Sequence, residues 1–264
     1  MGEEMVAYVR ELVAYRELLW SWVGREVKVR YKQSLLGVAW AILQPLSATI
    51  IMAVVFSYFV RLPTGGIPYP VFYYSALLPW TFTVTSITLG TESLVRNMHL
   101  VSKIYFPREI LPLASVLAGL VDLSIASVVF VLMIFLYRFP LGPTFALVPL
   151  LLLIQVLLTS GVVLFASALN VFYRDIRFVV PLGVQLWMYL TPIIYPVDMV
   201  PEQFRALYML NPMAVLIDGY RRVILYREWT DPAQLLVAAA ISLVVFVLAY
   251  AYFKRAEAVF ADVI

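Results

Sequence analysis

The sequence contains no cysteine, and only one of its 264 residues is a histidine, His99. The absence of cysteine excludes disulfide bonds, thiolate metal sites and a cysteine nucleophile, and one histidine cannot build a metal site alone. Charge is also scarce, because 13% of the residues are charged while 63% are hydrophobic. A soluble domain carries about 25% charged residues. We therefore expect an integral membrane protein that holds no metal.

Motifs for catalysis are missing as well. No stretch has the glycines and lysine of a phosphate-binding P-loop, and Thr64-Gly-Gly indicates only a turn. A serine hydrolase needs a base beside its nucleophile, but the single histidine lies in a polar loop and no G-x-S-x-G occurs. We expect no catalytic residue and no bound cofactor, so any work that the protein does draws its energy from elsewhere.

Six hydrophobic runs are each near the ~20 residues that a bilayer requires. All are predicted to be helices, because unpaired backbone is too costly in lipid, which gives an all-α six-helix transmembrane domain over residues 34–264. Residues 196–231 are more polar and broken by prolines, and their apolar run Met213–Ile217 is predicted to dip back into the membrane. The predicted spans cover residues 36–60, 71–95, 109–137, 144–172, 178–195 and 232–253.

Residues 1–33 are predicted to form an amphipathic helix at the membrane interface rather than a span. Glu3 and Glu4 stand where a signal peptide has basic residues. A basic patch, Lys28, Arg30 and Lys32, precedes the first span. The helix is either a surface anchor or a partner contact. Its apolar stripe consists of Met5, Tyr8, Leu12, Tyr15, Leu19 and Trp22, which recur at intervals of three and four.

The distribution of basic residues predicts the orientation of the chain. Thirteen of the nineteen lysines and arginines fall on the side that holds both termini, and six fall on the other side. Four of those six lie between Phe204 and Arg227. By the positive-inside rule both termini are cytoplasmic. We expect a multi-pass protein of the inner (plasma) membrane.

The polar loop from Arg96 to Arg108 separates the second and third spans and lies on the cytoplasmic side in this topology. It carries three basic residues, and Pro107 ends a short predicted amphipathic helix. We interpret the loop as a docking surface, and the alternative is a basic connector without a partner. The apolar residues of the predicted helix are Met98, Val101, Ile104 and Tyr105.

Polar residues inside the spans indicate a path for a hydrophilic solute. The stripe Tyr74, Thr81, Thr85, Thr88 and Glu92 occupies one sector of the second helix. Hydroxyls on one face can hydrogen-bond a solute, or they can join helices.

Asp122 lies in the middle of the third span. A charged side chain there costs free energy, so we interpret Asp122 as a functional residue. Its alternative role is structural, with a neighbour such as Gln155 or Gln185 as partner.

Aromatic residues are abundant, with six Trp, 17 Tyr and 16 Phe. Many fit interface belts, but those near the external halves of three spans also offer flat faces on which sugar rings can stack. This group contains Tyr58, Phe59, Phe72, Tyr73, Tyr74, Trp80, Phe82, Trp187, Tyr189 and Tyr195. The complete set of path candidates is Tyr58, Phe59, Tyr74, Trp80, Thr81, Thr85, Thr88, Glu92, Trp187 and Tyr189.

Four motifs, in this order and spacing, resemble the membrane subunits of type-2 ABC exporters, in particular those that export O-antigen, capsule or teichoic-acid polysaccharides. The resemblance covers nearly the whole chain. The motifs are Arg30-Tyr-Lys-Gln-Ser-Leu-Leu-Gly-Val-Ala-Trp-Ala-Ile-Leu-Gln-Pro45, Tyr105-Phe-Pro-Arg-Glu-Ile-Leu-Pro112, Asn170-Val-Phe-Tyr-Arg-Asp-Ile176 and Asn211-Pro-Met213.

The resemblance implies a homodimer with two copies of a separate cytoplasmic ATPase, which binds ATP and Mg, and no nucleic acid. Membrane lipids and a lipid-linked polysaccharide are the other implied partners. It also implies that loop 96–108 is the coupling helix, that the N-terminal helix is the interface helix and that segment 196–231 gates the exit. The residues assigned to coupling are Arg96, His99, Ser102, Lys103, Tyr105 and Arg108, with Arg25 and Lys28 on the interface helix.

Three other functions fit parts of the sequence. An ABC exporter of drugs or small lipids would share the topology, but fewer intramembrane aromatics and hydroxyls are expected in it. A membrane enzyme acting on lipid-linked sugars could use Asp122 or Glu92 as acid or base, but needs paired carboxylates within reach. An ATP-independent transporter or channel would show discontinuous helices in repeated halves, and the halves of this chain align poorly.

Overall fold

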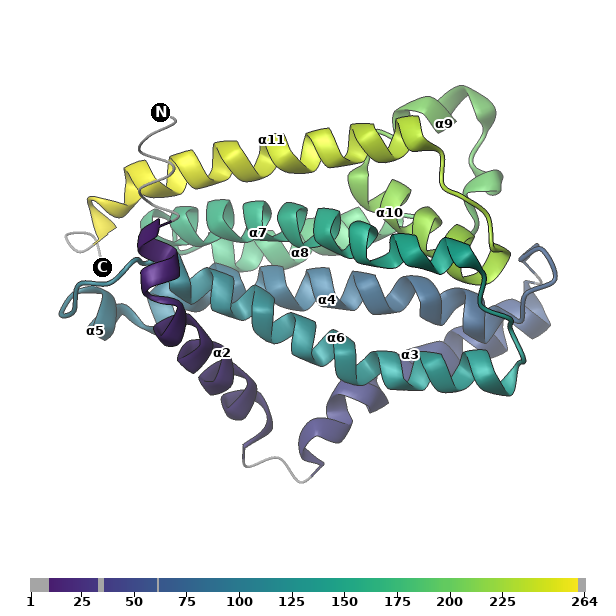
Figure 1. The fold of residues 1–264 in the computed structure, drawn as a ribbon, viewed down its shortest axis with the longest axis horizontal. Coiled ribbons are helices and arrows are strands. Elements are labelled where there is room, and N and C mark those ends of the chain that lie inside the picture. The colour runs from purple at the N-terminus through teal and green to yellow at the C-terminus, as the bar shows by residue number, and fades with distance from the viewer. Residues whose placement is uncertain (1–9, 33–35, 61, 261–264) are drawn as a thin grey trace.

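The computed structural model describes residues 10–32, 36–60 and 62–260, and these residues form helices and connecting loops without a β-strand. Figure 1 shows the arrangement of the helices. The α-helices are α2 (Arg16–Tyr31), α3 (Trp40–Val54), α4 (Tyr69–Arg96), α5 (Met98–Val101), α6 (Ile110–Leu136), α7 (Val148–Phe172), α8 (Ile176–Tyr189), α9 (Glu202–Tyr208), α10 (Pro212–Arg221) and α11 (Pro232–Glu257).

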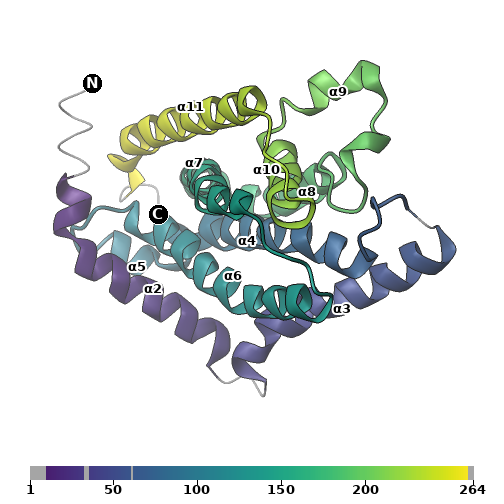
Figure 2. The ribbon, with the colours of Figure 1, turned by 45° about the vertical axis from the view of Figure 1, so that its right-hand side comes forward.

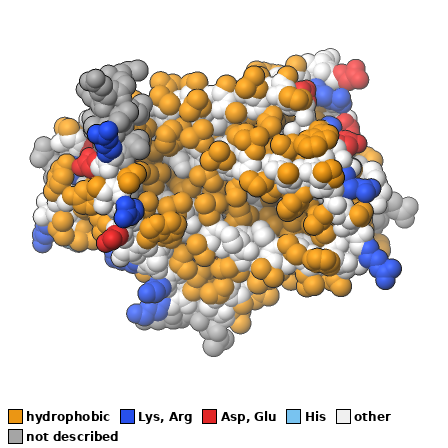
Figure 3. Space-filling view, viewed as in Figure 1, with side chains coloured by type: hydrophobic (Ala, Val, Ile, Leu, Met, Phe, Trp, Pro, Cys, Tyr) orange, Lys and Arg blue, Asp and Glu red, His pale blue; other side chains and the backbone are white. Residues whose placement is uncertain are grey.

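The long helices α4, α6, α7 and α11 run along the long axis of the molecule (Figure 1). The most extensive contacts join α4 with α6, α7 with α11 and α4 with α7, so α4 lies at the centre of the bundle. Hydrophobic side chains cover the middle of the face in Figure 3, and most charged side chains lie toward its two ends and along its lower left edge. This distribution is typical of a bundle that crosses a bilayer.

Within the described residues, four helical segments are long and apolar enough to cross a membrane: Gly37–Phe59, Ile110–Leu136, Pro143–Phe172 and Pro232–Glu257. Helix α4, with 28 residues, has sufficient length but is less apolar, because hydroxyl side chains, Glu92 and Arg96 interrupt it. It tolerates these groups because most of its residues are buried against other helices. Helix α8 has only 14 residues.

One predicted boundary is wrong. The fifth span was expected to extend to residue 195, but α8 ends at Tyr189. Pro192 disfavours helical backbone at the residue before it, Thr191, and the chain turns away from the helix there. The shorter helix leaves the following carbonyl groups in need of another hydrogen-bond donor.

Two apolar clusters form the core of the part of the chain that the structure describes. The larger one surrounds α4 and contains Phe72, Phe130 and Leu216. The smaller one lies at the end of the bundle where α2, the loop after α4 and the end of α11 meet, and it contains Trp22, Val101 and Phe253. Helix α2 is thus packed against the bundle rather than detached from it.

The close approach of α7 and α11 depends on Gly161. A Cβ atom at this position would lie 2.8 Å from the Cα of Phe246, which belongs to the backbone of α11. We expect Gly161→Ala to destabilise the protein by about 1–3 kcal/mol, because backbone cannot move aside as a side chain can. The thermal unfolding midpoint of the purified protein measures this.

Gly24→Ala is the matched control, since nothing lies within 4 Å of the Cβ that it would add in helix α2. Alanine has the higher helix propensity, so we expect this variant to be as stable as the wild type or slightly more stable. Equal unfolding midpoints for the two variants would show that Gly161 does not set the helix spacing.

Candidate coupling surface and permeation site

The loop after α4 presents polar side chains at one end of the bundle. Helix α5 is a single turn, and Val101 anchors it by inserting into the smaller core cluster. The exposed residues are Arg96, His99, Ser102, Lys103, Ile104 and Tyr105. The predicted amphipathic helix is therefore too long, because Ile104 and Tyr105 lie beyond it and are 56% and 81% exposed. The tip of the loop is both basic and apolar.

An ionic cluster ties the end of this loop to α11. The backbone N–H of Arg108 donates to Oε1 of Glu257 over 2.9 Å, and its guanidinium donates to the Glu257 carbonyl. Glu109 is fully buried and accepts hydrogen bonds from Tyr250 and Lys254 over 3.2 and 2.8 Å.

Burial raises the pKa of Glu109, and the Lys254 ammonium opposes this rise. Lys254 also lies 2.9 Å from Glu257. Arg108, which the resemblance assigns to coupling, is half-buried and links the loop to α11.

Helix α2 packs obliquely against α6, beside the same loop (Figure 2). Trp22 and Val23 are buried, and the guanidinium of Arg25 lies 4.3 Å from the centre of the Trp22 ring. Arg25 and Lys28 are exposed and line a groove on α2 together with Trp20. Met5 and Tyr8 of the predicted stripe lie outside the described residues.

Asp122 pairs with the end of α2. Its carboxylate forms an ion pair with Arg30 and accepts a hydrogen bond from the Tyr31 hydroxyl over 2.6 Å. Arg30 is therefore not a surface residue of a basic patch, because its side chain is 14% exposed and reaches the middle of α6.

Neither glutamine considered for Asp122 is its partner. Gln155 donates to the Pro79 carbonyl over 2.7 Å and to Thr83 over 2.9 Å, and it accepts from Tyr220. Gln185 is exposed on α8.

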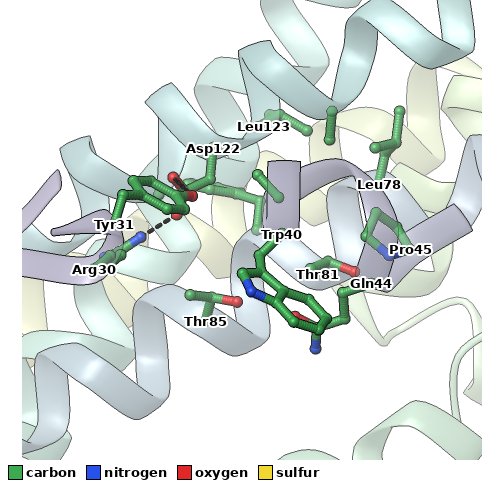
Figure 4. Close-up of a pocket in the computed structure, with 14 residues that line it drawn as sticks. Arg30, Tyr31, Trp40, Gln44, Pro45, Leu78, Thr81, Thr85, Asp122 and Leu123 are labelled. Carbon is green, nitrogen blue, oxygen red and sulfur yellow. Dashed lines mark hydrogen bonds and ion pairs between the residues drawn. The ribbon is translucent and has the colours of Figure 1, made fainter. Parts of the chain in front are cut away.

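A cavity of about 190 Å³ lies between α2, α3, α4 and α6, next to this ion pair. Figure 4 shows Arg30, Tyr31 and Asp122 on one side of it and Trp40, Gln44 and Thr85 on the other. Thr81 also lines it, so two predicted path hydroxyls and Asp122 meet at one site. Its remaining lining residues are Ala41, Pro45, Leu78, Phe82, Gly119, Leu123 and Ala126.

The other predicted path residues separate into groups. Tyr74 and Trp80 are buried: the Tyr74 hydroxyl donates to the Ala126 carbonyl, and Trp80 packs edge-on against Trp187. These two rings belong to the core, so we correct the expectation that they line a path. Tyr58, Phe59 and Tyr189 are exposed on the outside of this chain, while Thr88 and Glu92 are half-buried further along α4.

At the opposite end of the molecule, Asn211 fixes the start of α10. Its Oδ1 caps the helix by accepting from the backbone N–H of Met213, and it also accepts from Trp187 Nε1. Its amide nitrogen donates to the Leu190 carbonyl and to Thr191. Asn211 thereby joins the end of α8 to the beginning of α10, and Trp187 has a structural contact that the sequence did not reveal.

Helix α10 is inserted into the bundle, with the predicted apolar run Met213–Ile217 fully buried. At its end Arg221 is 1% exposed, although we had counted it among the external basic residues. Its guanidinium lies 3.6 Å from the centre of the Phe72 ring. The groups that accept its hydrogen bonds are the carbonyls of Phe72, Pro192, Ile193 and Tyr195.

Most of the chain is similar to known proteins. Residues 17–225 match the model of the ABC-2 type transporter family. The chain is 32% identical, over 98% of its length and 99% of the relative, to a Myxococcus xanthus protein named O-antigen export system permease protein RfbA. A Klebsiella pneumoniae protein of the same name is 34% identical over 75% of this chain and 76% of its own.

A more distant relative is the Escherichia coli polysialic acid transport protein KpsM. It is 21% identical to this chain over 88% of this chain and 91% of its own length. The predicted resemblance to type-2 ABC exporters of polysaccharides is therefore confirmed.

Proposed function

Because this chain belongs to the ABC-2 type transporter family, we propose that it is the permease half of an ATP-driven polysaccharide exporter. The chain is a transport subunit rather than an enzyme, and the polysaccharide leaves the cytoplasm across the inner membrane while linked to a lipid. The observation that carries this proposal is the similarity to O-antigen export permeases along nearly the full length of both chains.

Six crossings with both termini in the cytoplasm are the topology that we propose. Four helices have the length and apolar character of spans, α4 crosses at the protein-covered centre, and α8 crosses as a shorter helix. The beginning of α2 and the end of α11 lie near α5 at one end of the molecule, which supports a common side (Figure 1). The positive-inside rule makes that side cytoplasmic.

The exporter works as a homodimer. Helices α3 and α8 both pack on α4, yet only Pro45, Thr49 and Val184 are buried on them. Their large apolar faces are covered by a second copy of the chain and by lipid. Tyr58 and Phe59 lie in the π-helical turn that follows α3, and Tyr189 is the last residue of α8. All three are exposed, so they line the space between the two copies.

ATP and Mg bind to the partner ATPase, of which each permease half carries one copy. Closure of the ATPase pushes on the exposed tip of the loop, at Arg96, His99, Ser102, Lys103 and Tyr105. The smaller core cluster passes this movement to α2, and the Arg108–Glu257 link passes it to α11. The two halves then rock, and the polysaccharide advances past Thr81, Thr85, Thr88 and Glu92.

A cellular assay tests the function. We expect cells that lack this chain to accumulate the lipid-linked polysaccharide in the cytoplasm and to lose it from the surface. Expression of the chain restores surface polysaccharide only if the ATPase subunit is active. Normal surface polysaccharide in the cells that lack the chain would contradict the proposal.

A further inference from the structure

The guanidinium of Arg30 has one occupied edge and one unoccupied edge. Its Nη1 binds Asp122, whereas Nε and Nη2 have no hydrogen-bond partner among the described residues and are shielded from solvent. Buried donors without partners are costly. Adjacent N–H groups of this kind match two oxygens of a phosphate, which a guanidinium binds in a bidentate manner.

The surroundings hold Arg30 in place and reduce repulsion of an anion. Both oxygens of Asp122 are occupied, one by Arg30 and the other by the Tyr31 hydroxyl. Among the residues that line the adjacent cavity, Asp122 is the one carboxylate, while Gln44 and Thr85 offer further hydrogen-bond donors. The cavity beside Arg30 therefore offers hydrogen-bond donors to an anion, and its one carboxylate is already paired.

The depth of the site favours a phosphate over a sugar. Asp122 is the thirteenth of the 27 residues of α6, so the ion pair lies near the middle of a predicted span. A charged phosphate at this depth is unfavourable unless a cation binds it, whereas a neutral sugar requires hydrogen bonds alone. A buried arginine with free N–H groups supplies that cation.

We infer that Arg30 binds a phosphate of the lipid carrier during export, with Asp122 and Tyr31 as positioning residues. This inference rests on the proposed function, since it assumes that the polysaccharide is linked to a phosphate-bearing lipid. Helix α2 connects the site to the coupling loop, because Trp22 on α2 and Val101 in the loop share one apolar cluster. Movement of the loop thus shifts Arg30 while the phosphate crosses the membrane.

Binding of farnesyl diphosphate, an isoprenoid diphosphate, tests the site in the detergent-purified complex of the chain with its ATPase. Two variants are compared with the wild type. Arg30→Lys keeps a cation opposite Asp122 but removes the bidentate edge. The double variant Arg30→Gln/Asp122→Asn removes both charges together, so that no unpaired charge remains to unfold the protein.

We expect the wild type to bind farnesyl diphosphate at least about tenfold more tightly than farnesol. A tenfold difference in affinity corresponds to the contribution of one good charge-assisted hydrogen bond. Both variants should lose this preference and bind farnesol as the wild type does. Equal affinity of the wild type and both variants for farnesyl diphosphate would overturn the inference.

Competition experiments identify the source of the phosphate. If phosphatidylglycerol or inorganic diphosphate displaces farnesyl diphosphate as well as unlabelled farnesyl diphosphate does, the occupant is a bulk lipid headgroup or free phosphate, and the carrier assignment is wrong. Failure here is separable from failure of the proposed function. A chain that exports polysaccharide in cells, but whose variants bind farnesyl diphosphate normally, is an exporter without this site.

Discussion

Replacement of Arg221 by methionine is expected to prevent folding of the part of the protein where α10 meets α4 and the segment after α8. Four backbone carbonyls accept hydrogen bonds from this one guanidinium: those of Phe72 on α4 and of Pro192, Ile193 and Tyr195 after α8. Each buried acceptor left without a donor costs about 1–3 kcal/mol. The total approaches the stability of a typical domain, about 5–15 kcal/mol.

Arg222→Met is the matched control for Arg221→Met. Arg222 is the next residue, but its side chain is 39% exposed and pairs with Asp218 and Glu228. Exposed pairs of this kind contribute about 0–1 kcal/mol. Size-exclusion chromatography and thermal unfolding in detergent compare the two variants. Equal elution profiles and equal unfolding midpoints would show that Arg221 does not hold the segment after α8.

The double variant Arg96→Glu/Lys103→Glu is expected to stop export while leaving the fold intact. Both side chains are exposed at the end of the bundle that holds α5, so no buried group loses its partner. Reversal of two charges in a docking surface that has an acidic counterpart should weaken ATPase binding by at least about tenfold. Co-purification of the ATPase and surface polysaccharide in cells measure the effect.

The control is Arg138→Glu/Arg227→Glu, which makes the same change of charge at exposed positions on the opposite end of the bundle. Both residues have a left-handed backbone, with φ of 53° and 58°. Arginine and glutamate are strained alike in this conformation, so the substitutions change the charge without adding backbone strain. We expect normal ATPase binding from this control. Loss of binding in both double variants would indicate a nonspecific effect of net charge.

Local sequence patterns predict the positions of the helices, because these depend on residues that are close together in the chain. Hydrophobic runs locate the helices to within a few residues because burial in lipid requires a continuous apolar stretch. The end of α8 is the exception, because Pro192 acts within an apolar run. The Asn211-Pro-Met213 motif similarly marks the start of α10, since asparagine caps and proline fits the first helical turn.

Long-range pairs were not predictable in the same way. Arg30 and Asp122 are 92 residues apart, and nothing local distinguishes Arg30 from Lys28 and Lys32, which are exposed. Arg221 was likewise indistinguishable from Arg222, although one is buried and the other half-exposed. The side on which a residue packs depends on helix orientation, and a single sequence contains little information on that.

Crosslinking from position 102 tests most directly whether the loop 96–108 contacts the ATPase. The experiment is possible because the chain has no native cysteine. Ser102 is exposed beside Lys103 at the tip of the loop 96–108, and Ser102→Cys introduces a unique reactive site. We predict that a crosslinker on this cysteine captures the ATPase subunit in native membranes, and that Arg96→Glu/Lys103→Glu abolishes the capture. Absence of any ATPase crosslink from the folded, dimeric chain would contradict the claim that this loop couples the permease to ATP hydrolysis.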